Sequence, residues 1–310
     1  MNNLTLYITT VLIWGSTWIA ITFQLGPVDP LLSVGYRFLL AALLLLGYSH
    51  VAGKKLRFTR REHLFMALQG GLLFGLNYWL FYLTTAALTS GLVAVIFSTV
   101  VFMNMVNGRL WLGRSIQPHV VIAATIGLTG IVLVFWPELA QADSATTLGA
   151  LLLGLLATYL ASLGNILSAR NQQCGLPVMQ TNAYGMAYGG GLMLLMAVAG
   201  GTPLTFSVEL TYLLSLLYLS LFGSIVAFGC YLTLIGRIGA DRAAYAGLLF
   251  PVVALQLSAW FESYQWTPLS LTGLGMVLLG NLLMLTPPTR FRQLLSRSVR
   301  ARGVTGETTL

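Results

Sequence analysis

Charge is scarce in this sequence. Only 8% of its 310 residues are Asp, Glu, Lys or Arg, whereas 57% are hydrophobic. A water-soluble domain carries roughly a quarter of its residues charged. The low charge content excludes an ordinary soluble globular protein, so lipid must surround most of the chain.

Residues that build metal sites and disulfides are also rare, with two cysteines and three histidines in the whole chain. Cys174 lies in a polar stretch and Cys230 in an apolar run, which argues against a structural disulfide. The sequence has no HExxH, no GxSxG, no glycine-rich phosphate loop and no acidic cluster. We therefore expect no metal, no cofactor and no enzyme activity. The alternatives left open are a membrane enzyme acting on lipid and a channel.

The chain has instead many apolar runs long enough to cross about 30 Å of hydrocarbon. We predict an all-α integral membrane protein with ten transmembrane helices. The predicted spans are 4–23, 31–52, 64–84, 91–109, 117–137, 147–170, 177–199, 212–235, 243–262 and 267–286.

The basic residues alternate across these spans. With the N-terminus inside, fifteen of the sixteen Lys and Arg residues fall in inner connections or in the tail. This pattern sets the topology of inner-membrane proteins, so we predict a multi-pass protein of the cytoplasmic membrane with both termini cytoplasmic. It also explains the net charge of +8 without a nucleic-acid partner. Residues 287–310 should form a basic, disordered tail at the cytoplasmic leaflet.

Two halves of the chain share a pattern at a lag of about 150 residues. Tyr82-Leu83-Thr84 matches Tyr231-Leu232-Thr233, and 94–101 matches 246–253. Since five spans is an odd number, the second half must enter the membrane in the opposite sense. We expect two inverted five-helix repeats, 1–139 and 140–286, of the kind that builds many secondary transporters with the substrate site at midplane.

Several motifs, in order along the chain, resemble the EamA type of the drug/metabolite transporter superfamily. They are Trp14-Gly15-Ser16, Tyr36-Arg37-Phe38-Leu39-Leu40-Ala41-Ala42, Gly239-Ala240-Asp241, Pro251-Val252-Val253 and Glu262. The resemblance implies ten-helix carriers that move small metabolites, including amino acids and their derivatives, often outward. One departure is that the family often has Glu at the end of both the fourth and the ninth span, whereas this chain has Arg114 and Glu262.

Helical spacing suggests which faces line a transport path. In the third span Gly70, Gly71, Phe74, Asn77, Tyr78, Phe81 and Tyr82 share one arc, and Leu72, Leu73, Leu76, Leu80 and Leu83 share the opposite one. We expect the leucines to face lipid and the polar and aromatic arc to face the interior. The alternative is that the glycines serve close packing and the aromatics fill a core.

Other spans contribute candidates for substrate contact. Trp14 lies mid-span, where its indole N–H needs a partner, whereas Tyr7 and Trp18 could be interfacial anchors. Tyr231 shares a stripe with Ser220 and Ser224. Amides deep in spans could hold substrate or bond neighbouring helices; these are Asn104, Asn165 and Gln256.

Arg37 is the only basic residue well inside a span. It could anchor the helix by extending outward to the interface, or it could bind a substrate carboxylate. A phosphorylated substrate would want several basic groups, so a neutral, zwitterionic or aromatic metabolite fits better.

The sequence therefore predicts a small-molecule carrier in the bilayer that works by alternating access. No acid lies mid-span, so coupling should not need a deep carboxylate. Pro251 and Gly189-Gly190-Gly191 are candidates for hinges or for static bends. The sequence leaves the oligomeric state open, a monomer included.

The topology can be tested by accessibility. Single cysteines at Lys55 and Asp143, in a background with Cys174 and Cys230 replaced by serine, should react with an impermeant maleimide from opposite sides of the membrane. Reaction of both from the same side would contradict the predicted arrangement.

Overall fold

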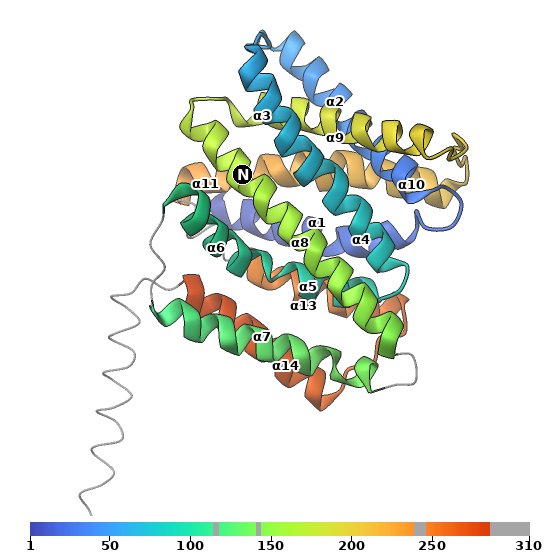
Figure 1. The fold of residues 1–310 in the computed structure, drawn as a ribbon, viewed down its shortest axis with the longest axis vertical. Coiled ribbons are helices and arrows are strands. Elements are labelled where there is room, and N and C mark those ends of the chain that lie inside the picture. Colours follow the sequence, from blue (N-terminus) through green and yellow to red (C-terminus); the bar gives the residue numbers. More distant parts are fainter. Residues whose placement is uncertain (114–117, 141–143, 239–245, 286–310) are drawn as a thin grey trace, which may run out of the picture.

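The computed structural model of this protein describes residues 1–113, 118–140, 144–238 and 246–285, and these residues form helices and connecting turns without any β-strand (Figure 1). The basic tail, Arg114, Asp143 and the Gly239-Ala240-Asp241 motif lie outside the described residues.

The first half of the chain supplies eight helical elements among the described residues. They are α1 (Asn3–Thr22), α2 (Pro30–Val51), α3 (Arg60–Gly70), the π-helix η1 (Gly71–Leu76), α4 (Asn77–Thr85), α5 (Ser90–Phe97), α6 (Val100–Leu112) and α7 (Pro118–Leu139). The second half supplies α8 (Ser144–Gln173), α9 (Val178–Ala199), α10 (Leu210–Tyr218), the π-helix η2 (Leu219–Val226), α11 (Ala227–Ile238), α13 (Ala246–Phe261) and α14 (Pro268–Leu285).

Local sequence accounts for several helix starts. The Asn2 side chain accepts a hydrogen bond from the Thr5 backbone N–H, and Asp29 caps α2 ahead of Pro30. Thr59 and Glu62 form a reciprocal capping box at the start of α3. Such caps satisfy backbone N–H groups that a helix leaves without partners.

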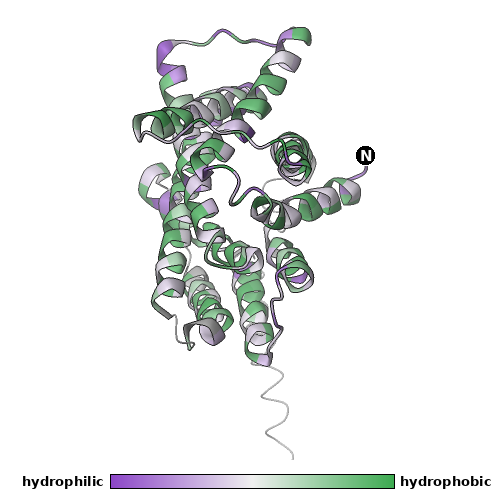
Figure 2. Ribbon diagram, turned by 90° about the vertical axis from the view of Figure 1, so that its right-hand side faces the viewer, coloured by the Kyte–Doolittle hydropathy of each residue, from purple (hydrophilic) through white to green (hydrophobic). Residues whose placement is uncertain are grey.

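Six helical stretches of the described chain are long and apolar enough to cross a membrane: 3–22, 30–51, 60–85, 90–112, 145–173 and 210–231. Three shorter apolar helices lie at 121–137, 249–261 and 268–283. Large apolar side chains such as Leu43, Leu110 and Trp136 are exposed on the outside of the bundle. Figure 2 shows hydrophobic residues along the helices and hydrophilic residues gathered mainly where the chain turns. An all-helical membrane fold is thereby confirmed, whereas the count of ten crossings stays a prediction.

The two halves pack as inverted copies. An added Cβ at Gly35 of α2 would lie 2.6 Å from Leu194 of α9, and one at Gly190 would lie 3.0 Å from the Leu39 backbone nitrogen. Residue numbers therefore increase along α2 as they decrease along α9, which makes the two equivalent helices antiparallel. Helices α7 and α14 are antiparallel as well, and α1 packs on α11 and α13 as α8 packs on α4, α5 and α6.

Both halves place a π-helix at equivalent positions, η1 after α3 and η2 after α10. A π-helix bonds each N–H to the carbonyl five residues back, which is rare and is frequent at functional sites. The Ser224 hydroxyl follows this spacing by donating to the Leu219 carbonyl, at 3.0 Å. Each π-helix lies directly before a helix with predicted site residues, Asn77 in α4 and Tyr231 in α11.

Hydrogen bonds join the halves at both ends of the bundle. At the end carrying Lys54 and Lys55, the Tyr184 hydroxyl donates to the Leu56 carbonyl at 2.8 Å. At the opposite end the Ser90 backbone N–H donates to the Glu262 carboxylate at 2.9 and 3.0 Å, and the Ser90 hydroxyl donates to it too. The connection that carries Lys54 and Lys55 and the end of α13 that carries Glu262 thus lie at opposite ends of the bundle.

Two expectations need correction. The leucine arc of the third span does not face lipid throughout, because α8 covers it: Leu80 is 8% exposed, and Leu73 packs on Gly164. Trp18 is no interfacial anchor, since it is 7% exposed and contacts Phe81. Sequence periodicity gives the apolar faces of a helix but cannot tell lipid from a neighbouring helix.

Neither candidate hinge interrupts its helix in this structure. Helix α13 continues through Pro251, and α9 continues through its three glycines. A Cβ at Gly189 would lie 2.5 Å from the Gly70 carbonyl oxygen, whereas nothing lies within 4 Å of one at Gly191. Gly189 therefore allows close approach of two backbones.

The different surroundings of Gly189 and Gly191 predict that an added methyl group will have opposite effects on stability at the two positions. Gly189→Ala should destabilise the protein by about 1–3 kcal/mol because the methyl group has no space. Gly191→Ala should be neutral or stabilise by roughly 0.5–1 kcal/mol through helix propensity. Thermal unfolding of both purified variants in detergent measures this, and equal melting temperatures would contradict the close contact.

Candidate functional site

Arg37 points into the protein. Its side chain is 1% exposed although it lies within α2, and its guanidinium carbon is 4.6 Å from the centre of the Tyr78 ring and 4.9 Å from that of Phe38. The expectation that it could extend outward to the interface is therefore wrong. The aromatic faces of Tyr78 and Phe38 attract the cation, and Gly223 leaves room beside its Nη2 atom.

The guanidinium lacks the partners that a buried cation normally has. Its Nε and Nη1 atoms have no hydrogen-bond partner. In the described chain the acids are Asp29, Glu62, Glu138, Glu209 and Glu262, which lie in turns or at helix ends. An unpaired buried charge is costly in a medium of low dielectric constant.

Polar groups that also lack partners lie next to this arginine. The Tyr82 hydroxyl lies beside the guanidinium and donates to the Gln24 side-chain oxygen. Gln24 is fully buried, and its Nε2 atom has no partner. Arg37 and Gln24 together present several free N–H donors around Tyr82.

Asn77 adds a free acceptor on the neighbouring helix. It opens α4 directly after η1, is 2% exposed and has a side-chain oxygen without a partner. It lies between Phe74 and Phe81 along one helix face, both fully buried. The predicted interior arc of the third span is confirmed by this burial.

Aromatic rings from both halves form a continuous wall. Trp14 contacts Phe228, Tyr231 and Phe250 with ring centres 5.0, 5.1 and 5.4 Å apart. Contacts continue from Phe228 through Phe74 and Phe38 to Tyr78. The structure thus links Trp14, Tyr231, Tyr78 and Arg37 in one cluster that includes residues of both halves.

The partner expected for the Trp14 indole is found. Its Nε1 atom donates to the Gly223 carbonyl at 3.1 Å, and Gly223 lies inside η2. The bond joins the first helix of one repeat to the π-helix of the other.

The other predicted amides are not linked to this cluster by a ring contact or hydrogen bond among the described contacts. The Asn165 side chain donates to that of Asn104 at 3.3 Å, which joins α8 to α6. Gln256 is half-buried on α13. For Asn104 and Asn165 this geometry matches the alternative of bonding between helices.

The sequence analysis missed Gln24, Phe38 and Phe228, and it also missed a buried amide network. The Gln69 side chain donates to Asn182 at 3.0 Å and accepts from Asn171 at 3.0 Å, and Arg170 donates to Asn171 at 3.1 Å. These amides have partners in one another and tie α3, α8 and α9 together. A search for all amides within the predicted spans would have found Gln69 and Asn182, whereas Asn171 lies just past the predicted span 147–170.

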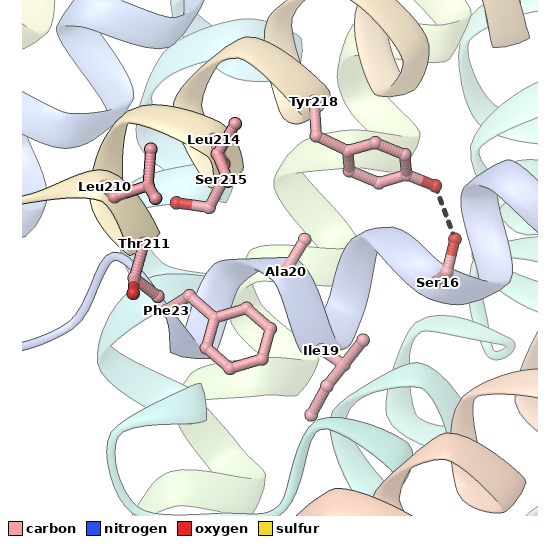
Figure 3. Close-up of a pocket in the computed structure, with 9 residues that line it drawn as sticks. All are labelled: Ser16, Ile19, Ala20, Phe23, Leu210, Thr211, Leu214, Ser215 and Tyr218. Atoms are coloured by element: carbon pink, nitrogen blue, oxygen red, sulfur yellow. Dashed lines mark hydrogen bonds between the residues drawn. The ribbon is translucent and has the colours of Figure 1, made fainter.

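A separate pocket of about 410 Å³ lies between α1 and α10 (Figure 3). Its wall is mostly apolar, and its polar contact is the hydrogen bond of 2.6 Å between Ser16 and Tyr218. None of the ten predicted site residues lines it. No charged group lines this pocket, whereas Arg37 and Gln24 bring a buried cation and a buried amide together at Tyr82. The described residues also hold no group of three His, Cys, Asp or Glu placed to bind a metal.

Comparison with known proteins supports the same fold. The chain matches the EamA-like transporter family over residues 2–136 and 148–286. It is 30% identical over 270 residues to the uncharacterized inner membrane transporter YedA of Escherichia coli K12, covering 86% of this chain and 85% of YedA. It is 25% identical over 282 residues to a probable amino-acid metabolite efflux pump of Salmonella typhimurium LT2, covering 89% and 92%. A solved crystal structure matches with a TM-score of 0.66 at 16% identity, covering 91% and 96%.

Removal of a buried amide should affect stability differently depending on whether the amide has hydrogen-bond partners. Asn77→Leu removes an acceptor without a partner and should leave the melting temperature unchanged or raise it. Gln69→Leu takes one hydrogen-bond partner from each of Asn171 and Asn182 and should lower the free energy of unfolding by about 1–3 kcal/mol. Thermal unfolding in detergent measures both, and a larger loss for Asn77→Leu than for Gln69→Leu would contradict the assignment.

Proposed function

We propose, because this chain belongs to the EamA-like transporter family, that it is a secondary transporter moving a small metabolite by alternating access. The observation that carries the proposal is a set of buried polar atoms without partners, on Arg37, Gln24 and Asn77, of which the Arg37 guanidinium lies against an aromatic wall built by both halves. Helix packing alone does not need groups that lack partners, whereas a binding site does.

The substrate we propose is an amino acid or a related neutral, zwitterionic or aromatic compound. Trp14, Tyr78, Phe81 and Tyr231 supply apolar and aromatic surface, and the amides supply hydrogen bonds. The efflux pump of Salmonella typhimurium named above is described as acting on amino-acid metabolites. Export is the direction we propose, on the strength of that relative.

The conformational change would use the two repeats, 1–139 and 140–286, as its moving bodies. Each end of the bundle holds bonds between them: Glu262 with Ser90 at one end, and Gln69 with Asn171 and Asn182 at the other. Alternating access requires that one set opens while the other holds. Both sets are formed in this structure.

The protein is a multi-pass inner-membrane protein, and its sidedness is proposed. The alternation of basic residues places both termini in the cytoplasm. In this arrangement Glu262 lies at the outer end and the amide network at the inner end. The relatives named above are transporters, in keeping with a chain that is not an enzyme.

Transport can be measured by counterflow in proteoliposomes loaded in turn with each of the twenty amino acids. The wild type should exchange at least one of them. Trp14→Ala should lower the initial rate roughly tenfold or more, since a buried Trp in a binding wall contributes strongly. Trp111→Ala is the matched control because Trp111 is 67% exposed on the bundle surface, and its rate should stay near wild type.

Failure of the wild type to exchange any member of the panel would argue against this substrate class. Poor membrane insertion of Trp14→Ala would instead assign Trp14 to helix packing.

A further inference from the structure

We propose that Arg37 is the receptor for a carboxylate, so that the transported metabolite carries one carboxylate group. This inference rests on the transport function proposed above and names the chemistry of its site. Two observations lead to it: the guanidinium is almost fully buried, and its Nε and Nη1 atoms have no hydrogen-bond partner.

The structural contacts of the guanidinium leave two of its nitrogen atoms without partners. An anchoring arginine reaches the interface, but this one turns inward between Tyr78 and Phe38. The guanidinium links α2 to α4 through its hydrogen bond with Tyr82, but its Nε and Nη1 atoms take no part in such a bond. Toward η2 the bond is made by the Arg37 backbone, whose carbonyl accepts from the Ser220 hydroxyl at 3.1 Å. Removing the charged group would leave that bond in place.

The groups around the Arg37 guanidinium favour an anionic ligand. Gln24 adds a free Nε2 donor, held through its oxygen by Tyr82, which lies beside the guanidinium. N–H donors on a fixed cation recognise carboxylates through charge-assisted hydrogen bonds. The rings of Phe38 and Tyr78 flank the guanidinium, whose Nε and Nη1 atoms stay without hydrogen-bond partners.

The number of basic side chains within the predicted spans narrows the class of ligand further. Every other Lys or Arg of the chain lies outside the apolar cores of the predicted spans. One guanidinium balances one negative charge, which suits a monocarboxylate and not a phosphate ester. The free oxygen of Asn77 can accept a hydrogen bond from an N–H group of the same ligand, as an amino acid or an N-acyl amino acid would offer.

The test compares each carboxylate with its neutral isostere. The panel contains the amino acids, their N-acetyl derivatives and the corresponding carboxamides, added singly to the purified full-length protein in detergent. A ligand that binds the folded state raises the melting temperature. At least one carboxylate should raise the wild-type melting temperature, and its carboxamide should bind at least about tenfold more weakly. Equal shifts for the pair, or no shift with any carboxylate, would overturn the inference.

Variants of Arg37 then show whether the rise in melting temperature caused by the carboxylate depends on this residue. Arg37→Met should abolish the shift caused by the carboxylate, whereas Arg37→Lys keeps the charge and should retain part of it. A full shift in Arg37→Met would overturn the assignment. The comparison of carboxylate and carboxamide in the wild type does not depend on either variant folding.

The melting temperatures of the unliganded variants show whether Arg37 serves ligand binding or stabilises the fold. Arg37→Met removes an uncompensated buried charge, so the unliganded variant should melt at the wild-type temperature or above it. Arg170→Met is the matched control, because Arg170 bonds Asn171 and lies 3.2 Å over the Phe65 ring; it should melt lower. A melting temperature for Arg37→Met as low as that of Arg170→Met would show a structural role.

Proteoliposome flux distinguishes this inference from the function on which it rests. If the wild type exchanges a carboxylate and Arg37→Met does so equally well, transport stands and the receptor assignment fails. If the wild type binds a carboxylate through Arg37 but shows no flux, the assignment stands and the transport proposal fails.

Discussion

Hydrocarbon offers no hydrogen-bond partners, so a chain that is 57% hydrophobic must pair its few polar groups within its own helices. Hydroxyls do this locally: Thr10, Thr84 and Thr158 each donate to the carbonyl four residues earlier. The amides of Gln69, Asn171 and Asn182 pair with one another. Among the buried side chains of the described residues that keep an atom without a partner, which include Gln24, Asn77, Asn107 and Asn281, Arg37 is the charged one.

The same constraint shapes the backbone. Two halves that bury each other need close helix crossings, and glycines provide them at equivalent helices: Gly35 with Gly190 in α2 and α9, and Gly130 with Gly273 in α7 and α14. The π-helices η1 and η2 occur once in each half and precede the helices that carry Asn77 and Tyr231. The proposed site residues Asn77 and Tyr231 therefore lie just after the regular helical geometry changes in each half.

Periodicity within single helices predicted what depends on a single helix. The interior arc with Phe74, Asn77 and Phe81 was predictable because small, polar and aromatic residues recur at helical spacing. The opposite leucine arc was mispredicted because leucine is equally suited to lipid and to α8, and only the tertiary fold distinguishes them. Gln24 was missed because it follows the first apolar run, and the inward course of Arg37 depends on rings of α2 and α4 together.

The crossing of α3 and α9 brings Gly70, Gly185 and Gly189 together, and a Cβ on Gly70 or Gly189 would meet backbone atoms of the other helix. Helices usually interlock through ridges and grooves of side chains, which hold their axes about 8–10 Å apart. Where the backbones themselves meet, the separation of the two helices is set by backbone atoms. No residue larger than glycine at Gly70 or Gly189 is compatible with this separation.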